Sequence, residues 1–237
     1  MSVMTDSQTP FSLFVTGTDT EIGKTLIAAA LVHALASQGL STAAMKPVAA
    51  GIEWRDGRQC NDDIDTLRSV ASCRLAPEVM TPYLWEPPIA PHIAAAQAGV
   101  AMQSQVLLDA YAKAAEQAQA VVIEGVGGFC VPLSDTEDMA DVAQRLGLPV
   151  VLVVGMRLGC ISHAVLTAQA VAARGLPLCG WVANTVDPDM PYLQENLDTL
   201  TARLPAPFLG RVPRLEKADP AQAAQYIDVS RIAGWPV

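Results

Sequence analysis

The run GTDTEIGKT, residues 17–25, constrains this chain most, because it lies between an apolar segment and an alanine-rich stretch. The segment Phe11–Val15 has the composition of a strand, and a helical pattern opens at Leu26. Gly-Lys-Thr between a strand and a helix is typical of a loop that wraps nucleotide phosphates. The run departs from the usual pattern in one respect, because Thr18 stands where a glycine is expected.

Each residue type at the end of this run has a chemical use. Gly23 lets the backbone approach a polyphosphate, and Lys24 brings a positive charge suited to the β and γ phosphates. The hydroxyl of Thr25 can ligate the magnesium that accompanies them. We therefore predict an ATP or GTP site; the alternative is a chance triplet at a helix start, which the flanking strand and helix disfavour.

Composition limits the classes of partner. The 237 residues suit one α/β domain, which we expect to span residues 11–237. A net charge of -9 argues against binding to nucleic acid or to an anionic membrane, because both are bound by clustered lysine and arginine. We expect neither partner.

The chain shows no sign of an exported or disulfide-bonded protein. Residues 1–10 are polar, lack the order of a secretory signal, and are expected to form a disordered N-terminus. The five cysteines are odd in number and include no Cys-x-x-Cys pair. We expect a soluble, cytoplasmic protein with free thiols.

Apolar runs alternate with helical patterns along the chain. This alternation predicts a doubly wound, mostly parallel sheet of about six or seven strands with helices on both faces. Two stretches, 51–61 and 80–92, break the alternation with charges, glycine and prolines, and both are expected to be loops over the nucleotide end. The expected strands are Phe11–Val15, Thr42–Val48, Ala120–Ile123, Pro149–Val154, Leu178–Ala183 and Phe208–Val212, and the expected helices are Leu26–Gln38, Ile64–Ala71, Gln103–Gln119, Ser162–Arg174 and Tyr192–Leu204.

Two acidic segments are candidates for binding magnesium. Glu124 ends an apolar strand and is followed by Gly125-Val126-Gly127-Gly128, the arrangement in which a carboxylate holds a metal beside a phosphate loop. Asn61-Asp62-Asp63 precedes a helical pattern, so one of these residues could be an ordinary helix N-cap. Asp63 could instead be a second metal carboxylate, and both roles can coexist if Asn61 or Asp62 provides the cap.

Lys46 and Asn184 end two other predicted strands. Pro47 keeps the backbone extended and aims Lys46 toward the phosphate loop, where an ammonium would serve the charge that develops in phosphoryl transfer. The alternative for Lys46 is a solvated surface lysine. The amide of Asn184 suits the edge of a purine, although a turn role is equally compatible with the sequence. Free amides at Gly159–Ser162, where a helix opens, could bind a carboxylate.

Together these segments closely resemble the dethiobiotin synthetase family, over nearly the whole chain. Members of that family use ATP to close a ureido ring from 7,8-diaminopelargonic acid and carbon dioxide. The most specific segments are GTDTEIGKT, KPVAAG, NDD at Asn61–Asp63, EGVGG followed by PLSDT, VVGMRLGCISHA and GWVAN.

The resemblance implies a role for individual residues. It implies that Lys46 and Lys24 are catalytic and that Mg²⁺ is held by Thr25, Asp63 and Glu124. The ATP-binding residues that it implies are Glu21, Ile22, Gly23, Lys24, Thr25, Leu26, Asp63, Glu124, Gly125, Val126, Gly127, Asn184, Thr185, Pro213, Arg214 and Leu215. The substrate-binding residues that it implies are Thr20, Glu21, Ala50, Gly159, Cys160, Ile161 and Ser162, with Gly159–Ser162 receiving the substrate carboxylate across a homodimer interface.

The implied reaction begins with a carbamate formed from an amine and carbon dioxide, continues with its phosphorylation by ATP, and ends with ring closure. Glu21 could orient or deprotonate an amine in this sequence of steps. The chain departs from the family pattern at two positions. Ala50 replaces a serine that touches the diamine, and Thr185 replaces an aspartate that often follows the base-site asparagine. Because neither position belongs to the phosphate or metal groups, we expect altered substrate affinity and the same reaction.

Two alternatives belong to other functional classes. A dimeric switch ATPase of the partition or cell-division type has the same predicted architecture, but such proteins usually carry a lysine early in the phosphate loop. Residues 16–20 contain none. An amide-forming ligase acting on a corrinoid precursor is the second alternative, and no glutaminase-like segment with a cysteine nucleophile is apparent.

Overall fold

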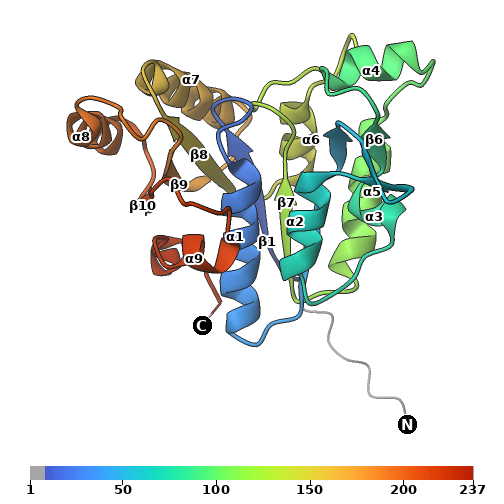
Figure 1. The fold of residues 1–237 in the computed structure, drawn as a ribbon, viewed down its shortest axis with the longest axis horizontal. Helices are drawn as coiled ribbons and strands as arrows, with labels where there is room; N and C mark the ends of the chain where they lie inside the picture. The colour runs from blue at the N-terminus through green and yellow to red at the C-terminus, as the bar shows by residue number, and fades with distance from the viewer. Residues whose placement is uncertain (1–8, 237) are drawn as a thin grey trace.

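A six-stranded parallel sheet forms the centre of the computed structural model, which describes residues 9–236 (Figure 1). The order of its strands is β10-β9-β8-β1-β7-β2, and every neighbouring pair is parallel. The strands are β1 (Phe11–Gly17), β2 (Thr42–Met45), β7 (Ala120–Glu124), β8 (Val150–Met156), β9 (Leu178–Thr185) and β10 (Phe208–Val212). The prediction of a doubly wound α/β sheet is confirmed.

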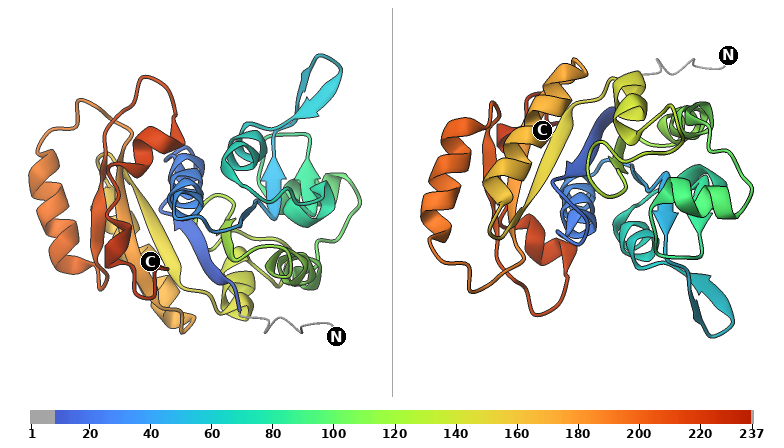
Figure 2. Two further views of the ribbon diagram at one scale, coloured as in Figure 1. Left: turned by 90° about the horizontal axis from the view of Figure 1, so that it is seen from below. Right: turned by 90° about the horizontal axis from the view of Figure 1, so that it is seen from above.

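Helices cover both faces of this sheet because its strands are apolar on both sides (Figure 2). On β8, Val151 and Val153 belong to the apolar cluster of α1 and α9, whereas Leu152 and Val154 belong to the cluster of α7 and α8. The helices are α1 (Lys24–Ser37), α2 (Asp62–Val70), α3 (Pro77–Met80), α4 (Pro91–Gln97), α5 (Ser104–Ala115), α6 (Met139–Leu146), α7 (Cys160–Ala173), α8 (Leu193–Arg203), α9 (Pro220–Ala224) and the 3-10 turn Val229–Arg231.

The strand order reverses beside β1, which fixes where a ligand can bind. The chain runs from β1 to the edge strand β2, returns to β7, and then crosses to β8 on the other side of β1. Ligands of doubly wound sheets bind at the carboxyl ends of the strands beside such a reversal. The loops after β1, β2 and β7 lie at that position.

The two segments expected to be loops contain regular structure. Residues 51–61 hold the hairpin of β4 (Glu53–Arg55) and β5 (Arg58–Cys60), which turns at Asp56-Gly57 with positive φ at both residues. Asp-Gly is a strong signal for this tight turn, and the sequence analysis missed it. Residues 80–92 hold β6 (Tyr83–Trp85) and the start of α4.

The strand expected over Thr42–Val48 is split into two. It leaves the main sheet after Met45, and β3 (Val48–Ala50) pairs instead with β6 in a small separate sheet. Pro47 explains the break, because proline has no N–H for the hydrogen-bond ladder. Helix α6, which begins at the capping box of Asp138 and Asp141, was also not expected from the sequence.

The N-terminal prediction concerns residues 1–10, of which 1–8 lie outside the described residues. Within residues 9–236, no helix is both long and apolar enough to span a bilayer.

Candidate active site

Sheet register brings the charged residues of the site together. Met45 of β2 pairs with Ile123 of β7, so that Lys46 and Glu124, the next residues along the two strands, lie side by side. Val15 of β1 pairs with Glu124, which places the loop after β1 at the same edge. Three neighbouring strands therefore deliver an ammonium, a carboxylate and the phosphate loop to one place.

The phosphate loop has a shape that requires glycine at one point. Gly23, which precedes α1, has φ +79°, and a Cβ there would lie 2.2 Å from Nδ2 of Asn184. The neighbouring Ile22 is buried against β8, where a Cβ on Gly155 would lie 2.5 Å from its side chain. Any other residue at Gly23 would therefore displace the loop or Asn184. The sequence analysis did not identify Gly155 as part of this support.

Lys24 is buried at the start of α1, with its ammonium turned into the loop. Its Nζ donates a hydrogen bond to the backbone carbonyl of Asp19 at 2.6 Å. Burial lowers the pKa of Lys24 to about 8, and repulsion from the Lys46 ammonium acts in the same direction. Lys24 is thus a cation at neutral pH that is close to losing its proton.

Lys46 forms ion pairs with both predicted metal carboxylates. Its Nζ lies 2.5 Å from Oε1 of Glu124 and 2.9 Å from Oδ2 of Asp63. Burial alone would lower the pKa of Lys46, but attraction to the two carboxylates outweighs it and raises that pKa above its usual value. Burial would likewise raise the pKa of Asp63, but Lys46 and a hydrogen bond from Thr25 hold it below its usual value. Lys46 is therefore a buried, charged residue and not a solvated surface lysine.

The residues that could hold a metal converge as a compact set of oxygens. The hydroxyl oxygen of Thr25 lies 2.6 Å from Oδ1 of Asp63 and 2.9 Å from Oε1 of Glu124. Neighbouring ligands around an octahedral Mg²⁺ with bonds of about 2.1 Å lie about 3 Å apart, so these spacings fit the ion. Oε2 of Glu124 is buried without a hydrogen-bond partner, which leaves a lone pair available. Among residues 9–236, no three His, Cys, Asp or Glu side chains are grouped so that they alone could hold a metal ion.

Asn61 provides the N-cap of α2. Its Oδ1 accepts a hydrogen bond from the backbone N–H of Ile64 at 3.2 Å, and its Nδ2 donates to the carbonyls of Ala50 and Gly51. Asp63 is therefore free of capping and contacts Thr25 and Lys46 instead. The capping role therefore falls on Asn61, and Asp63 stays available for the predicted role of a metal carboxylate.

A cavity of about 860 Å³ adjoins this cluster. Twelve of the site residues predicted from the sequence line this cavity: Thr20, Glu21, Gly23, Lys24, Thr25, Leu26, Lys46, Ala50, Asp63, Glu124, Val126 and Gly127. An apolar wall that includes Ile89 and Val131 was not predicted residue by residue, although the segment of Ile89 was expected to be a loop over the nucleotide end. Ile22 and Gly125 do not line the cavity.

A smaller cavity of about 270 Å³ lies beyond Gly23 and brings together Asn184, Thr185, Pro213, Arg214 and Leu215. Nδ2 of Asn184 donates to the carbonyl of Ile22 at 2.8 Å, so the side chain is held with its donor facing the loop. Oδ1 and the second N–H of Nδ2 remain for a ligand. The hydroxyl of Thr185 is buried without a partner, and strand alternation points it to the opposite face of β9 from Asn184.

Residues Gly159–Ser162 open α7, as expected, but they line neither cavity, and the N–H of Cys160 is not free because it donates to the carbonyl of Arg157 at 3.0 Å. Arg157, just before them, forms an ion pair with Asp19 of the phosphate loop. Leu158 projects from the same turn and is 95% exposed. The turn is therefore attached to the phosphate loop yet faces away from the site of its own chain.

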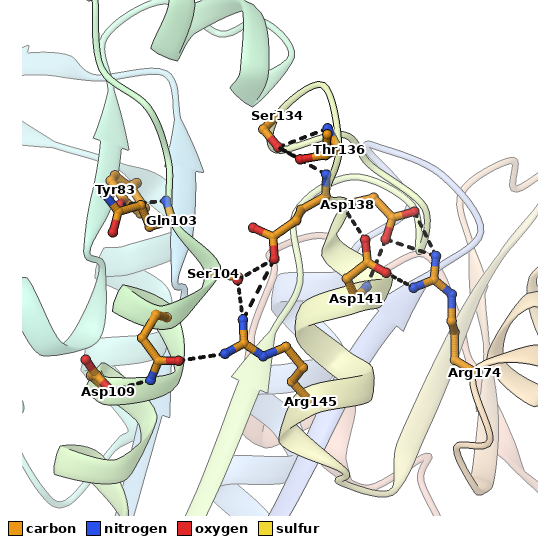
Figure 3. A network of polar contacts seen from close by, with 12 residues as sticks. Tyr83, Gln103, Ser104, Asp109, Ser134, Thr136, Asp138, Asp141, Arg145 and Arg174 are labelled. Carbon is orange, nitrogen blue, oxygen red and sulfur yellow. Dashed lines mark hydrogen bonds and ion pairs between the residues drawn. The ribbon is translucent and has the colours of Figure 1, made fainter.

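Polar contacts hold the chain that follows the glycine-rich turn (Figure 3). Ser104, at the start of α5, donates to Glu137 at 2.7 Å, and Arg145 of α6 donates to Ser104. The backbone amides of Leu133 and Ser134 both donate to the carbonyl of Glu137. One end of the segment that lines the large cavity is thereby fixed to two helices.

Arg174, which follows α7, reinforces the same region (Figure 3). Its guanidinium pairs with Asp138 at 3.2 Å and also with Asp141. These two aspartates form the capping box of α6, so Arg174 ties the end of one helix to the beginning of another.

Comparison with known proteins gives two kinds of match. Residues 12–222 match a family described as an AAA domain. The chain is 54% identical to the ATP-dependent dethiobiotin synthetase BioD of Janthinobacterium sp. (strain Marseille). The matched region of 230 residues covers 95% of this chain and 98% of that protein.

Solved structures with a similar fold have much lower identity. A ParA family ATPase from Chlorobium tepidum TLS has a TM-score of 0.52 at 15% identity, over 94% of this chain and 93% of that one. The MinC:MinD cell division protein complex of Aquifex aeolicus gives 0.53 at 15% identity, over 90% and 86%. At this identity the matches establish the fold alone.

The pKa of Lys24 predicts how the affinity for phosphates depends on pH. The protonated ammonium attracts phosphate, so affinity for ADP without metal should be full below about pH 8 and should fall between pH 8 and 9.5. Calorimetric titration at a series of pH values measures this. Lys24→Arg is the control, because guanidinium keeps its charge in this range. Parallel pH curves for the two proteins would contradict the assignment.

Proposed function

Because this chain belongs to the dethiobiotin synthetase family, it is an ATP-dependent enzyme that makes dethiobiotin, and we propose that the Lys46 cluster beside the phosphate loop is its active centre. The observation that carries this assignment is the position of two lysines, Lys24 and Lys46, on one cavity with the carboxylates of Asp63 and Glu124. A phosphoryl transfer to a carbamate brings together anions that need such cations.

In the proposed reaction, one amine of 7,8-diaminopelargonic acid attacks carbon dioxide and loses a proton to give a carbamate. A carbamate oxygen then takes the γ-phosphoryl group of ATP, and ADP leaves. The second amine attacks the carbamate carbon, closes the five-membered ring and releases phosphate. Lys24 and Lys46 would hold the carbamate and γ-phosphate oxygens in line and offset their charge. Glu21 lines both cavities and is placed to orient an amine.

We assign Thr25, Asp63 and Glu124 as the residues that would hold Mg²⁺. The spacing of their oxygens and the unpartnered Oε2 of Glu124 support this assignment. When bound, the ion would neutralise phosphate charge during transfer. Thr25 and Glu124 come from the first turn of α1 and the end of β7, so the sheet presents them to the phosphate loop.

We assign the small cavity beside Asn184 to the adenine base. Oδ1 of Asn184 is an acceptor, which matches the exocyclic amine of adenine, and Pro213 and Leu215 offer apolar surface to the ring. The neighbouring Gly23 and Leu26 line both cavities, so a nucleotide can extend from one to the other.

We infer that the enzyme acts as a homodimer. The amides at Gly159–Ser162 line no cavity of their own chain, so they could receive a substrate carboxylate only in a second copy. The exposed side chains of Leu158, Leu166 and Tyr192 supply apolar surface near this turn and α8. Ala50, at the position where the family resemblance implies a serine, lines the large cavity and offers the diamine no hydroxyl.

A switch ATPase was the alternative considered from the sequence. The fold that it shares with this chain is matched at only 15% identity, whereas the dethiobiotin synthetase match is 54% over nearly the whole chain. We also propose a cytoplasmic location, because all five cysteines lie within residues 9–236 and none forms a disulfide.

The reaction is tested with purified protein, ATP, Mg²⁺, the diamine and bicarbonate. ADP should form only when both the diamine and carbon dioxide are present, because the carbamate is the phosphoryl acceptor. Mass analysis with ¹³C-bicarbonate should place one labelled carbon in the cyclised product. ATP turnover that ignores either substrate would instead favour a switch ATPase.

The role of Lys46 is tested by Lys46→Met, which keeps the apolar stem and removes the charge. We expect kcat to fall by about 100-fold or more, because a cation at the transferring phosphoryl group is lost, while the Kd of an ATP analogue changes by less than about fivefold. Steady-state kinetics and calorimetry separate the two quantities. Full activity of the variant would remove Lys46 from the mechanism.

The homodimer is tested by Leu158→Glu, which puts a charge on the exposed turn. Light scattering should give the wild type twice its 25.0 kDa chain mass and the variant a mass near that of one chain. The matched control Val106→Glu changes an exposed apolar residue on α5 and should stay dimeric. A monomeric wild type, or a Leu158→Glu variant that remains dimeric, would count against this interface.

A further inference from the structure

Lys46 stands where a cation of the proposed metal site would be expected. Its Nζ contacts Oε1 of Glu124 at 2.5 Å and Oδ2 of Asp63 at 2.9 Å, and the residue is only 3% exposed. These are the same two carboxylates that, with Thr25, form the candidate Mg²⁺ ligands. An ammonium and a metal ion would therefore compete directly for Oε1 of Glu124, whereas on Asp63 the ammonium contacts Oδ2 and the oxygen beside Thr25 is Oδ1.

The oxygens of this site need a cation among them to stay close together. A hydroxyl has one hydrogen, so Thr25 can donate to Asp63 or to Glu124 but not to both, although it lies within 2.9 Å of an oxygen of each. The carboxylates of buried Glu124 and half-exposed Asp63 also repel each other. The ammonium of Lys46 offsets both effects, which keeps the ligands grouped before any metal binds.

The large cavity beside Lys46 has room for its ammonium. The ammonium is carried on a flexible four-carbon stem, and the cluster borders the large cavity that Lys24 also lines. Lys24 contacts neither carboxylate, because its Nζ donates a hydrogen bond to the carbonyl of Asp19 instead. Oε1 of Glu124 cannot keep a full contact with both the ammonium and a dication, because the two positive charges would lie side by side.

We propose that Lys46 is a built-in substitute for the metal: its ammonium fills the cation position in the metal-free enzyme and leaves both carboxylates when the ion binds. This inference rests on the proposed function. Metal loading then frees Lys46 to point into the cavity, where the carbamate and the γ-phosphate would lie. The enzyme thereby gains its second phosphate-binding cation only once the metal is present.

Metal binding without nucleotide tests the exchange. Mn²⁺ is the probe, and its free concentration is followed by electron paramagnetic resonance. Lys46→Met should bind Mn²⁺ about tenfold more tightly than the wild type or better, because no ion pair has to be broken. Lys24→Met is the matched control: it removes a charge near the same cavity without a contact to either carboxylate, so its effect acts at longer range and should raise the affinity by only about threefold. Equal effects of the two variants, or no gain for Lys46→Met, would overturn the proposal.

A second measurement, by nuclear magnetic resonance, is made on the wild type. A variant is needed only to assign the signal to Lys46. Buried ammonium groups in ion pairs exchange their protons slowly, so the wild type labelled with ¹⁵N-lysine should give a ¹H–¹⁵N signal for Nζ of Lys46. ADP alone should leave this signal in place, and addition of Mg²⁺ should shift or remove it. A signal unchanged at saturating Mg²⁺ and ADP would show that Lys46 keeps its carboxylates.

The two ideas can fail separately. If Lys46→Met lost turnover but bound Mn²⁺ no better than the wild type, Lys46 would keep its proposed catalytic role and the exchange would be wrong. If diamine-dependent ADP formation were absent, the proposed function would fail whatever the Mn²⁺ affinity.

Discussion

The contact of Lys46 with buried Glu124 and half-exposed Asp63 is the interaction on which the site depends. Removing these charges from water is costly, and the cost is recovered only while opposite charges stay within hydrogen-bonding distance. Truncating either partner would leave an uncompensated buried charge. The pairing of β2 with β7 makes the contact possible, because the backbone register alone places Lys46 beside Glu124.

The phosphate loop is fixed from several strands at once. Ile22 packs over Gly155 of β8, Asn184 of β9 holds the carbonyl of Ile22, and Asp19 pairs with Arg157 after β8. A loop held in this way keeps its anion-binding shape before a ligand arrives, so little ordering is needed on binding. The glycine-rich turn after β7 is supported separately, through Arg145 and the helices α5 and α6.

Sequence reasoning identified the parts that depend on local pattern. The strand, loop and helix around Gly23 to Thr25, the carboxylate at Glu124 and the alternation of elements were all readable, because each is a short segment with a characteristic composition. It could not separate a solvated Lys46 from a buried one, since that depends on the register of two strands far apart in sequence. The orientation of the Asn184 carboxamide is likewise set by a contact between distant residues, its hydrogen bond to the carbonyl of Ile22.

The segments that were misread had strong local signals for irregular structure. Prolines at 82, 87 and 88 and the charges of 53–58 favoured loops, yet short strands formed because β3 and β6 could pair with each other and Asp56-Gly57 closes a hairpin. Such pairing is a long-range effect that a single sequence does not report. The departures lie outside the central sheet, so they leave the position of the site unchanged.

The carboxamide of Asn184 both supports the phosphate loop and lines the base cavity. This double role limits which substitutions at Asn184 could change the nucleotide preference of the enzyme. Its nitrogen braces the phosphate loop and its oxygen faces the base cavity. An exchange made there to admit a keto-bearing base would also loosen the grip on the triphosphate. Variation in base selectivity is therefore better tolerated at Pro213–Leu215, on the other wall of the cavity, where no bond to the loop is at stake.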